Sequence, residues 1–408
     1  MSRSLDRTFR SASARVVGVL AARYRDLDLA EEAFAEACAR AAEAWRSTRP
    51  ERPDGWLYAV AQRCALDLLR KREVRERHIA GEIAADAGAE AAMDEELQFI
   101  PDERLRLIFV CCHPAIAPDA RAALTLRTVC GLRTAEIAHA FLTSETAFAQ
   151  RLVRAKRKIA EAGVPFEIPG PNLWAERLDA VLSTLEVAYS KAHEDAAAAG
   201  PHAPYAEEML NLSKVLADLI PDEADVLAFA ALVRFCEARR PARTDAQGCM
   251  IPLAEQDPAR WDRALIDEGD RYLKRAFALQ ASSARLLQAG IHATWCVRKS
   301  LDEPPPWPKV LALYDSLASI SDNPVTRLNR IVALAEVRGC AAALEEIAGL
   351  ESAGMDGFLP YHAVRADLFC RAGRSALARS EYDRALALCP GAAEAQWLRR
   401  RRDAQLDS

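Results

Sequence analysis

Five cationic side chains lie within one short segment of the chain: Arg151, Arg154, Lys156, Arg157 and Lys158. Ammonium and guanidinium groups bind the phosphates of nucleic acid and release counterions as they do so. A helix that carries such groups can enter the major groove of DNA, where its side chains reach the base edges. The chemistry that this segment offers is therefore recognition of nucleic acid.

The surrounding sequence predicts a helix, a tight turn and a second helix between Thr134 and Ile159. An apolar stripe with the spacing i, i+4, i+7 and i+11 predicts the buried face of the second helix: Phe148, Leu152, Ala155 and Ile159. The cations fall off this stripe, so the helix can bury one side and offer positive charge on the other.

The start of the second helix is also predicted from the sequence. Ser144 is a favoured N-cap residue, Glu145–Ala147 would form the first turn, and Leu142–Ser144 would make the connection to the preceding helix. Two interpretations fit the segment by itself. It is either a helix-turn-helix that binds DNA, or an amphipathic surface helix whose basic face is solvated.

The composition of the whole chain favours neither interpretation. The 408 residues, 51% of them apolar, predict a globular protein of two to three domains with a formal net charge of −5. Because no global positive field attracts nucleic acid, DNA contacts must come from local patches. A second such patch comprises Arg70, Lys71, Arg72, Arg75 and Arg77.

The eleven cysteines are scattered and form no CxxC pair. The sequence also shows no signal peptide and no apolar run of the roughly 18 residues that could span a membrane. We therefore expect reduced, mostly buried thiols in a cytoplasmic protein without membrane contact.

Ala, Leu, Glu and Arg recur at helical spacing along almost the whole chain, and no convincing alternating strand occurs. We expect an all-α fold. The first block, 7–78, would hold helices at 12–24, 28–45 and 56–78. A linker at 79–100 would lead to a second block, 101–162, and a larger helical block would occupy 172–408.

The last block has an internal period. Gly373 follows Gly339 by 34 residues, and the spacing of Ala378, Tyr382 and Ala385 matches a tetratricopeptide repeat. Stacked helical pairs would bury small residues and leave a concave surface for a protein or peptide partner. The period predicts a tetratricopeptide-like domain.

Two further helices carry groups that could bind partners. Asp28, Glu31, Glu32 and Glu36 give the helix at 28–45 an acidic face, which could serve the helix dipole or dock on a basic partner. In the next helix, Trp56 and Tyr58 lie near Arg63, Arg70 and Lys71. Aromatic rings beside cations can stack and hold single-stranded nucleic acid, although Trp56 could equally be a core residue.

The order of these parts resembles an extracytoplasmic-function (ECF) sigma factor, the specificity subunit of bacterial RNA polymerase. The resemblance covers nearly the whole chain, and three segments resemble a subgroup with a tetratricopeptide-like extension: DERLRLIFVCCHPAIAPDARAAL, TAEIAHAFL with AQRLVRAKRKI, and IPLAEQDPARWDRALI. It implies a sigma region 2 at 7–78, a region 4 at 101–162, and a regulatory extension.

The resemblance also implies roles for residues. Those implied to bind core RNA polymerase are Asp28, Glu31, Glu32 and Glu36. Those implied to bind promoter DNA at the −10 and −35 elements are Trp56, Arg63, Arg70, Lys71, Ser144, Glu145, Gln150, Arg151, Arg154, Lys156, Arg157 and Lys158. Many ECF sequences have Gln where this chain has Ala35, and Asn where it has Arg63.

Other classes of function are less well supported by the sequence. A helix-turn-helix regulator with a tetratricopeptide sensor, acting without polymerase, is the alternative function. We find no motif of an enzyme and expect no catalytic residue and no cofactor. The string Cys111-Cys112-His113 is a poor tetrahedral ligand set, so we expect packing rather than metal binding there.

Overall fold

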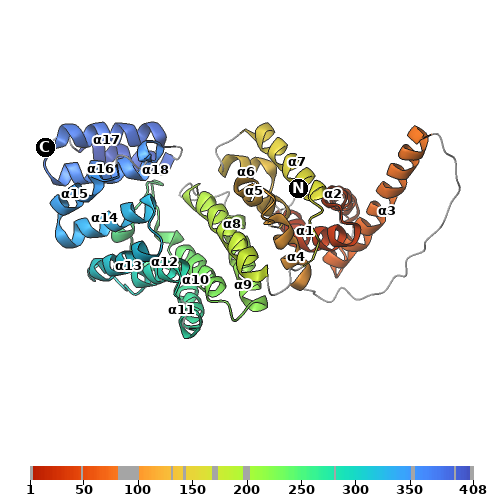
Figure 1. Ribbon diagram of the computed structural model, residues 1–408, viewed down its shortest axis with the longest axis horizontal. Coiled ribbons are helices and arrows are strands. Elements are labelled where there is room, and N and C mark those ends of the chain that lie inside the picture. Colours follow the sequence, from red (N-terminus) through yellow and green to blue (C-terminus); the bar gives the residue numbers. More distant parts are fainter. Residues whose placement is uncertain are drawn as a thin grey trace. The chain divides into compact units, whose positions relative to one another are not determined.

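The computed structural model describes residues 3–46, 49–80, 101–129, 132–140, 144–167, 173–195, 203–279, 282–350, 354–389 and 392–404. In these ranges every regular element is a helix, apart from one isolated bridge between Thr244 and Met250. The prediction of an all-α fold is therefore confirmed. The chain divides into two compact units, Met1–Lys191 and Ala192–Ser408 (Figure 1).

The helices that begin in the first unit are α1 (Arg3–Tyr24), α2 (Leu27–Ala44), α3 (Pro53–Ala80), α4 (Pro101–Cys111), α5 (Pro118–Thr128), α6 (Thr134–Ala140), α7 (Glu145–Glu161) and α8 (Trp174–Asp195). The three helices expected in the first block are present, but α1 begins nine residues earlier than the predicted start at residue 12. The expected linker at 79–100 lies outside the described residues, except for its first two, which end α3.

Helix α2 begins where its sequence provides a cap. The side chain of Asp26 accepts a hydrogen bond of 2.9 Å from the backbone N–H of Leu29, which satisfies one unpaired donor of the first turn. The apolar residues of α2 then recur on one side and are buried against α1 and α3. This packing leaves the carboxylates of α2 on the opposite side.

The second half of helix α4 is buried on all sides. The six consecutive residues from Leu107 to Cys112 are each at most 2% exposed, whereas a surface helix buries only one stripe. The reason is that α4 contacts both α1 and α5. Near its end, the thiol of Cys112 lies 3.4 Å from the hydroxyl of Thr125 in α5.

The helices of the second unit are α9 (Ala203–Leu219), α10 (Ala224–Ala238), α11 (Arg263–Ala278), α12 (Ala284–Cys296), α13 (Trp307–Ile320), α14 (Pro324–Arg338), α15 (Cys340–Ala348), α16 (Leu359–Arg371), α17 (Ser375–Leu388) and α18 (Ala392–Asp403). Short 3-10 helices connect some of them: η2 (Arg240–Ala242), η3 (Leu253–Glu255), η4 (Pro258–Arg260) and η6 (Met355–Gly357).

Helix α10 lies at the centre of this unit and contacts α9, α11 and α12. Almost all of its side chains are buried, including Phe229 and Phe235. Gly269 allows α11 to approach, because a Cβ atom at that position would lie 2.8 Å from the ring of Phe235.

The helices after α13 form pairs. Gly339 separates α14 from α15 and Gly373 lies between α16 and α17, and both glycines have positive φ angles, of 90° and 72°. Such angles favour glycine over residues with a side chain. The equivalent turns therefore lie 34 residues apart, at the predicted period, and Ala378, Tyr382 and Ala385 on α17 are fully buried as expected.

Candidate nucleic-acid interface

Helix α7 has the two faces that its sequence predicts. The hydroxyl of Ser144 accepts a hydrogen bond of 3.2 Å from the backbone N–H of Ala147, so the predicted N-cap is confirmed. The predicted apolar stripe is also confirmed, because its four residues are at most 6% exposed. Leu142 and residue 143 of the predicted turn lie outside the described residues.

The other face of α7 carries the predicted DNA-binding residues. Those exposed to solvent are Ser144, Glu145, Gln150, Arg154, Arg157 and Lys158, and Arg151 is half-buried. Arg157 pairs with Glu161 at 3.2 Å but remains 71% exposed, so the pair is a weak surface interaction that leaves the guanidinium accessible. These side chains can therefore reach phosphates or bases without repacking the helix.

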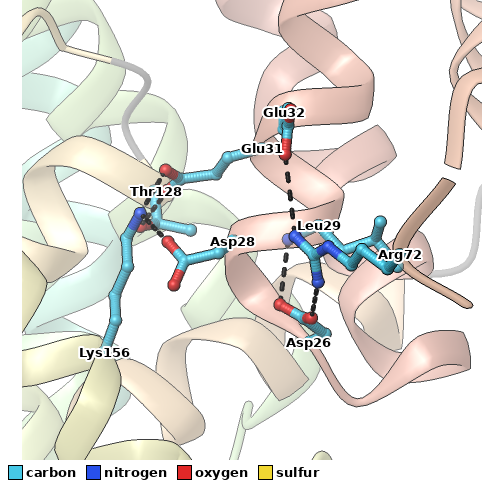
Figure 2. Close-up of polar contacts among 8 residues, drawn as sticks. All are labelled: Asp26, Asp28, Leu29, Glu31, Glu32, Arg72, Thr128 and Lys156. Carbon is cyan, nitrogen blue, oxygen red and sulfur yellow. Dashed lines mark hydrogen bonds and ion pairs between the residues drawn. The ribbon is translucent and has the colours of Figure 1, made fainter. Parts of the chain in front are cut away.

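Lys156 differs from its neighbours on α7. Its side chain is only 13% exposed, and its Nζ atom donates to Asp28 at 2.8 Å and to Glu31 at 2.6 Å (Figure 2). Burial opposes the charge of Lys156, but the carboxylates of Glu31 and Asp28 outweigh it and raise the pKa of the ammonium above its ordinary value. Lys156 therefore binds α2 within this chain.

The acidic face of α2 is engaged by three other elements. Glu31 also accepts a hydrogen bond of 3.1 Å from the hydroxyl of Thr128 at the end of α5. On the other side, Arg72 of α3 pairs with Asp26 at 2.7 Å and with Glu32 at 3.6 Å (Figure 2). The fourth predicted polymerase-binding residue, Glu36, pairs with Arg40 at 3.2 Å, and both side chains are about half exposed.

Helix α3 carries the residues predicted to line single-stranded DNA. Trp56 is half-buried and packs edge-on against Trp45, with 5.4 Å between ring centroids. Arg63, Arg70 and Lys71 are exposed along the next turns. An accessible ring followed by exposed cations is the arrangement that a stacking platform requires, although the packing of Trp56 also contributes to the core. The side chains of residues 75 and 77 lie outside the described set.

The string at the end of α4 is part of the core. Cys111 and Cys112 are buried, and burial raises the pKa of Cys112 to about 11, so its thiol stays protonated at neutral pH. The Nδ1 atom of His113 accepts a hydrogen bond of 3.1 Å from the backbone N–H of Ala115. Within the described residues, no cluster of three or more His, Cys, Asp or Glu side chains could hold a metal ion, and no disulfide joins the cysteines.

None of the described helices has the length and apolar character needed to cross a membrane.

Sequence reasoning missed the contact of α7 and α5 with α2. The sequence predicts that Lys156 binds DNA and that Asp28 and Glu31 bind an external partner, and it predicts no role for Thr128. A signal was present, because a cationic helix and an acidic helix in one chain attract each other. The two partners are 125 positions apart, however, and only the fold brings them together.

Three segments of the chain match families of known proteins. Residues 8–75 match sigma-70 region 2, residues 106–159 match sigma-70 region 4, and residues 177–277 match a family of unknown function (DUF6596). An uncharacterized protein of Rhizobium meliloti (strain 1021) is 35% identical over 406 residues, which cover 98% of this chain and 95% of the relative. No solved structure shows a significant match. The chain therefore belongs to one family with the Rhizobium meliloti protein, over almost the whole length of both, and its matches to sigma-70 regions 2 and 4 support a role in promoter recognition.

Proposed function

We propose that the chain is an ECF sigma factor that binds core RNA polymerase through α2 and recognises the −10 and −35 elements of promoters through α3 and α7. One observation carries the proposal. Helix α7, in the part matched to region 4, has a capped start, one buried face and exposed cations on the other face. Helix α2, in the part matched to region 2, presents an acidic face. A regulator that acted without polymerase would require only the first of these surfaces.

The sites follow from this assignment. Gln150, Arg151 and Arg154 would contact base edges of the −35 element, and Arg157 and Lys158 would contact phosphates. Trp56, Arg63, Arg70 and Lys71 would bind the melted strand at the −10 element. Both partners, polymerase and promoter DNA, are cytoplasmic in bacteria, so we propose the same location for this chain.

A run-off transcription assay tests the proposal directly. Purified chain is added to core RNA polymerase and a library of promoter fragments, and association with the core enzyme is measured in parallel. We expect a stable complex and initiation at a defined subset of fragments. Duplex binding without association with the core enzyme would instead favour the helix-turn-helix regulator.

We propose further that the second unit is a tetratricopeptide-like domain that regulates the sigma regions by binding a protein or peptide. Its helical pairs with equivalent glycine turns support this assignment. The unit also contains a groove of about 580 Å³ whose lining includes Trp295, Trp307, Tyr314, Asn329, Arg371 and Trp397. Aromatic walls with a few polar groups suit an extended peptide. The rings supply contact area, and the side-chain amide of Asn329 can hydrogen-bond the backbone of the peptide.

The regulatory role is tested by removing the second unit. The shortened chain should end at Lys191 rather than directly after α7, because the part of α8 before that residue belongs to the first compact unit. If the second unit regulates, transcription by the shortened chain should differ from that of the full chain several-fold. Equal transcription in vitro and in cells would contradict regulation by this unit.

A further inference from the structure

The groove of the second unit has two ends that differ in chemistry. At one end, Leu253 and Ala254 of the segment between α10 and α11 pack on an apolar cluster that includes Trp295. Trp307 and Tyr314 of α13 pack on the same cluster, so this end is rich in aromatic rings. At the other end the walls are α14, α16 and α18, which carry charged side chains. We call the first the aromatic end and the second the charged end.

The side chains of the charged end neutralise one another. Arg371 pairs with Glu336 at 2.6 Å and with Asp367 at 3.7 Å. Arg401 of α18 also pairs with Asp367. Two guanidinium groups therefore face two carboxylates, and the charged end has no net charge. A charged ligand would have to compete with these ion pairs to bind there.

The aromatic end has a carboxylate without such a partner. Glu255 lines the groove and is exposed, and none of the hydrogen bonds and ion pairs within the described residues involves its side chain. The charged residues that line the groove are three acids and two arginines, so the groove has one surplus negative charge, at Glu255. A ligand with a positive charge at this end would complement it.

The wall that carries Glu255 is fixed within the second unit. Next to it, the carbonyl oxygen of Ala254 accepts a hydrogen bond of 3.0 Å from Arg298, which is buried. In the same segment, Asp245 pairs with Arg400 of α18 at 3.2 Å. Because the segment is held at both points, a ligand that binds Glu255 has little additional backbone to order.

Two neutral polar groups also line the groove. The hydroxyl of Tyr314 has no hydrogen-bond partner among the described residues. Burial raises the pKa of Tyr314 to about 12, against the opposite effect of Arg239, so this hydroxyl stays protonated at neutral pH. Asn329 is exposed on α14. Hydroxyl and amide groups can each donate and accept, as the alternating N–H and C=O groups of an extended peptide require.

We propose that the groove binds an extended segment of a partner protein that places a lysine or arginine against Glu255 and a bulky apolar side chain against Trp307. This inference rests on the proposed peptide-binding role of the second unit and names the chemistry of the partner. A basic side chain suits the aromatic end, because its methylene stem packs along a ring while its charged group reaches a carboxylate. An acidic segment would instead meet Glu255 as a like charge.

A library of capped hexapeptides, screened against the labelled full-length chain, tests the proposal. The selected peptides are resynthesised with a fluorescent label, and their affinities are measured by anisotropy. We expect the selected peptides to share a lysine or arginine beside a bulky apolar residue. Selection of acidic peptides, or of no peptide, would overturn the proposal.

Charge reversal shows where the selected peptides bind. Glu255→Lys should weaken their binding at least tenfold, and a peptide with glutamate in place of its basic residue should bind this variant more tightly than it binds the parent. The fold should survive, because Glu255 is exposed. Glu345→Lys is the matched control, because it makes the same change on α15, at an exposed position outside the groove, and should leave the affinity unchanged.

Tyr314→Phe provides a second variant that removes only a hydroxyl group. It should weaken basic and neutral peptides alike by about threefold, as expected for the loss of one hydrogen bond to the peptide backbone. Basic peptides that bind the parent, Glu255→Lys and Tyr314→Phe equally well would lie elsewhere, for example on the acidic face of α2, and would refute the assignment to the groove.

The outcomes separate the chemistry of the partner from the regulatory role. If the selected peptides depend on Glu255, but neither the peptides nor removal of the second unit changes run-off transcription, the assignment of the groove stands and the regulatory role fails. If removal of the second unit changes transcription several-fold while no basic peptide binds the groove, the regulatory role stands and the proposed partner is wrong.

Discussion

In the second unit several arginines lie inside the fold, whereas on α7 of the first unit Arg154 and Arg157 lie at the surface. Arg234, Arg239 and Arg298 are 2%, 6% and 3% exposed. Each buried guanidinium is surrounded by acceptors. Arg298, for example, donates to the carbonyl groups of Glu303 and Ala254 and so joins the segment after α12 to η3.

The difference separates arginines that stabilise a fold from those that can bind a ligand. A buried cation has lost its hydration, so the surrounding acceptors must replace it, and removing the cation leaves them unsatisfied. An exposed cation keeps its hydration, and its removal changes the free energy of unfolding little. Arginines of the second unit should therefore affect stability, and those on α7 should affect binding.

The largest expected effect is that of Arg234→Ala on the stability of the second unit. Arg234 forms an ion pair of 2.8 Å with Glu268, donates to Ser213 and Ala230, and lies over the ring of Tyr272. Breaking such a buried network should lower the free energy of unfolding by about 3–5 kcal/mol. Hydrogen exchange of the α10 amide groups measures this change without interference from the first unit.

Arg275→Ala is the matched control for this change. Arg275 also lies near the ring of Tyr272, with 5.9 Å to the centroid, but its side chain is exposed. We expect a loss of less than about 0.5 kcal/mol. Equal losses for the two variants would contradict the distinction between buried and exposed arginines.

The next largest effect is expected at the acidic face of α2. Glu32→Lys combined with Glu36→Lys should weaken association with core polymerase by about a hundredfold, because like charges would then face a basic surface of the polymerase. Both side chains are more than half exposed, so thermal unfolding should change little. Binding of duplex DNA through α7 should persist.

Association of this double variant at the level of the parent would remove the main argument for a sigma factor over a free-standing regulator. Asp28→Lys and Glu31→Lys are less suitable for this test, because these residues contact Lys156 and their reversal would also break those ion pairs within the chain. Glu32 and Glu36 have no hydrogen bond or ion pair with α7 among those that the structure describes.

The same comparison shows which features can be predicted from sequence. The cap of α7 at Ser144 and the stripe from Phe148 to Ile159 were predicted because both depend on residues within a few turns. The turns at Gly339 and Gly373 were found because repetition marks them. By contrast, the burial of Arg234 depends on three helices around it, and its charge predicts a surface position.

The candidate site was predicted only in part, for the same reason. The exposed face of α7 followed from its periodicity, but the capture of Lys156 by Asp28 and Glu31 depends on a contact between two regions. The periodicity of one helix predicts which of its positions are exposed and which are buried. It cannot predict that an exposed cation has a partner more than 100 residues away in the sequence. The assignments to promoter and polymerase came from resemblance and remain proposals.

A smaller effect is expected when a cation is removed from the exposed face of α7. Arg154→Ala should weaken binding to the cognate promoter by about 1–3 kcal/mol and relax specificity at one position of the −35 element. The fold should survive, because Arg154 is exposed and its Nε atom donates only a long bond of 3.4 Å to the backbone of Gln150. Unchanged promoter affinity together with unchanged circular dichroism would show that this face of α7 does not enter the groove.

The smallest effect is expected for Lys158→Ala, which separates phosphate contacts from base contacts on the same helix. Lys158 is exposed near the end of α7, one turn beyond Arg154. An ammonium that meets a phosphate releases about one counterion whatever the sequence, so affinity should fall by a similar factor on cognate and unrelated duplexes. The slope of log affinity against log salt concentration should decrease by about one. Titrations at several salt concentrations measure both quantities. A loss confined to the cognate promoter, with the salt slope unchanged, would instead assign Lys158 to a base edge and move the register of α7 in the groove by one turn.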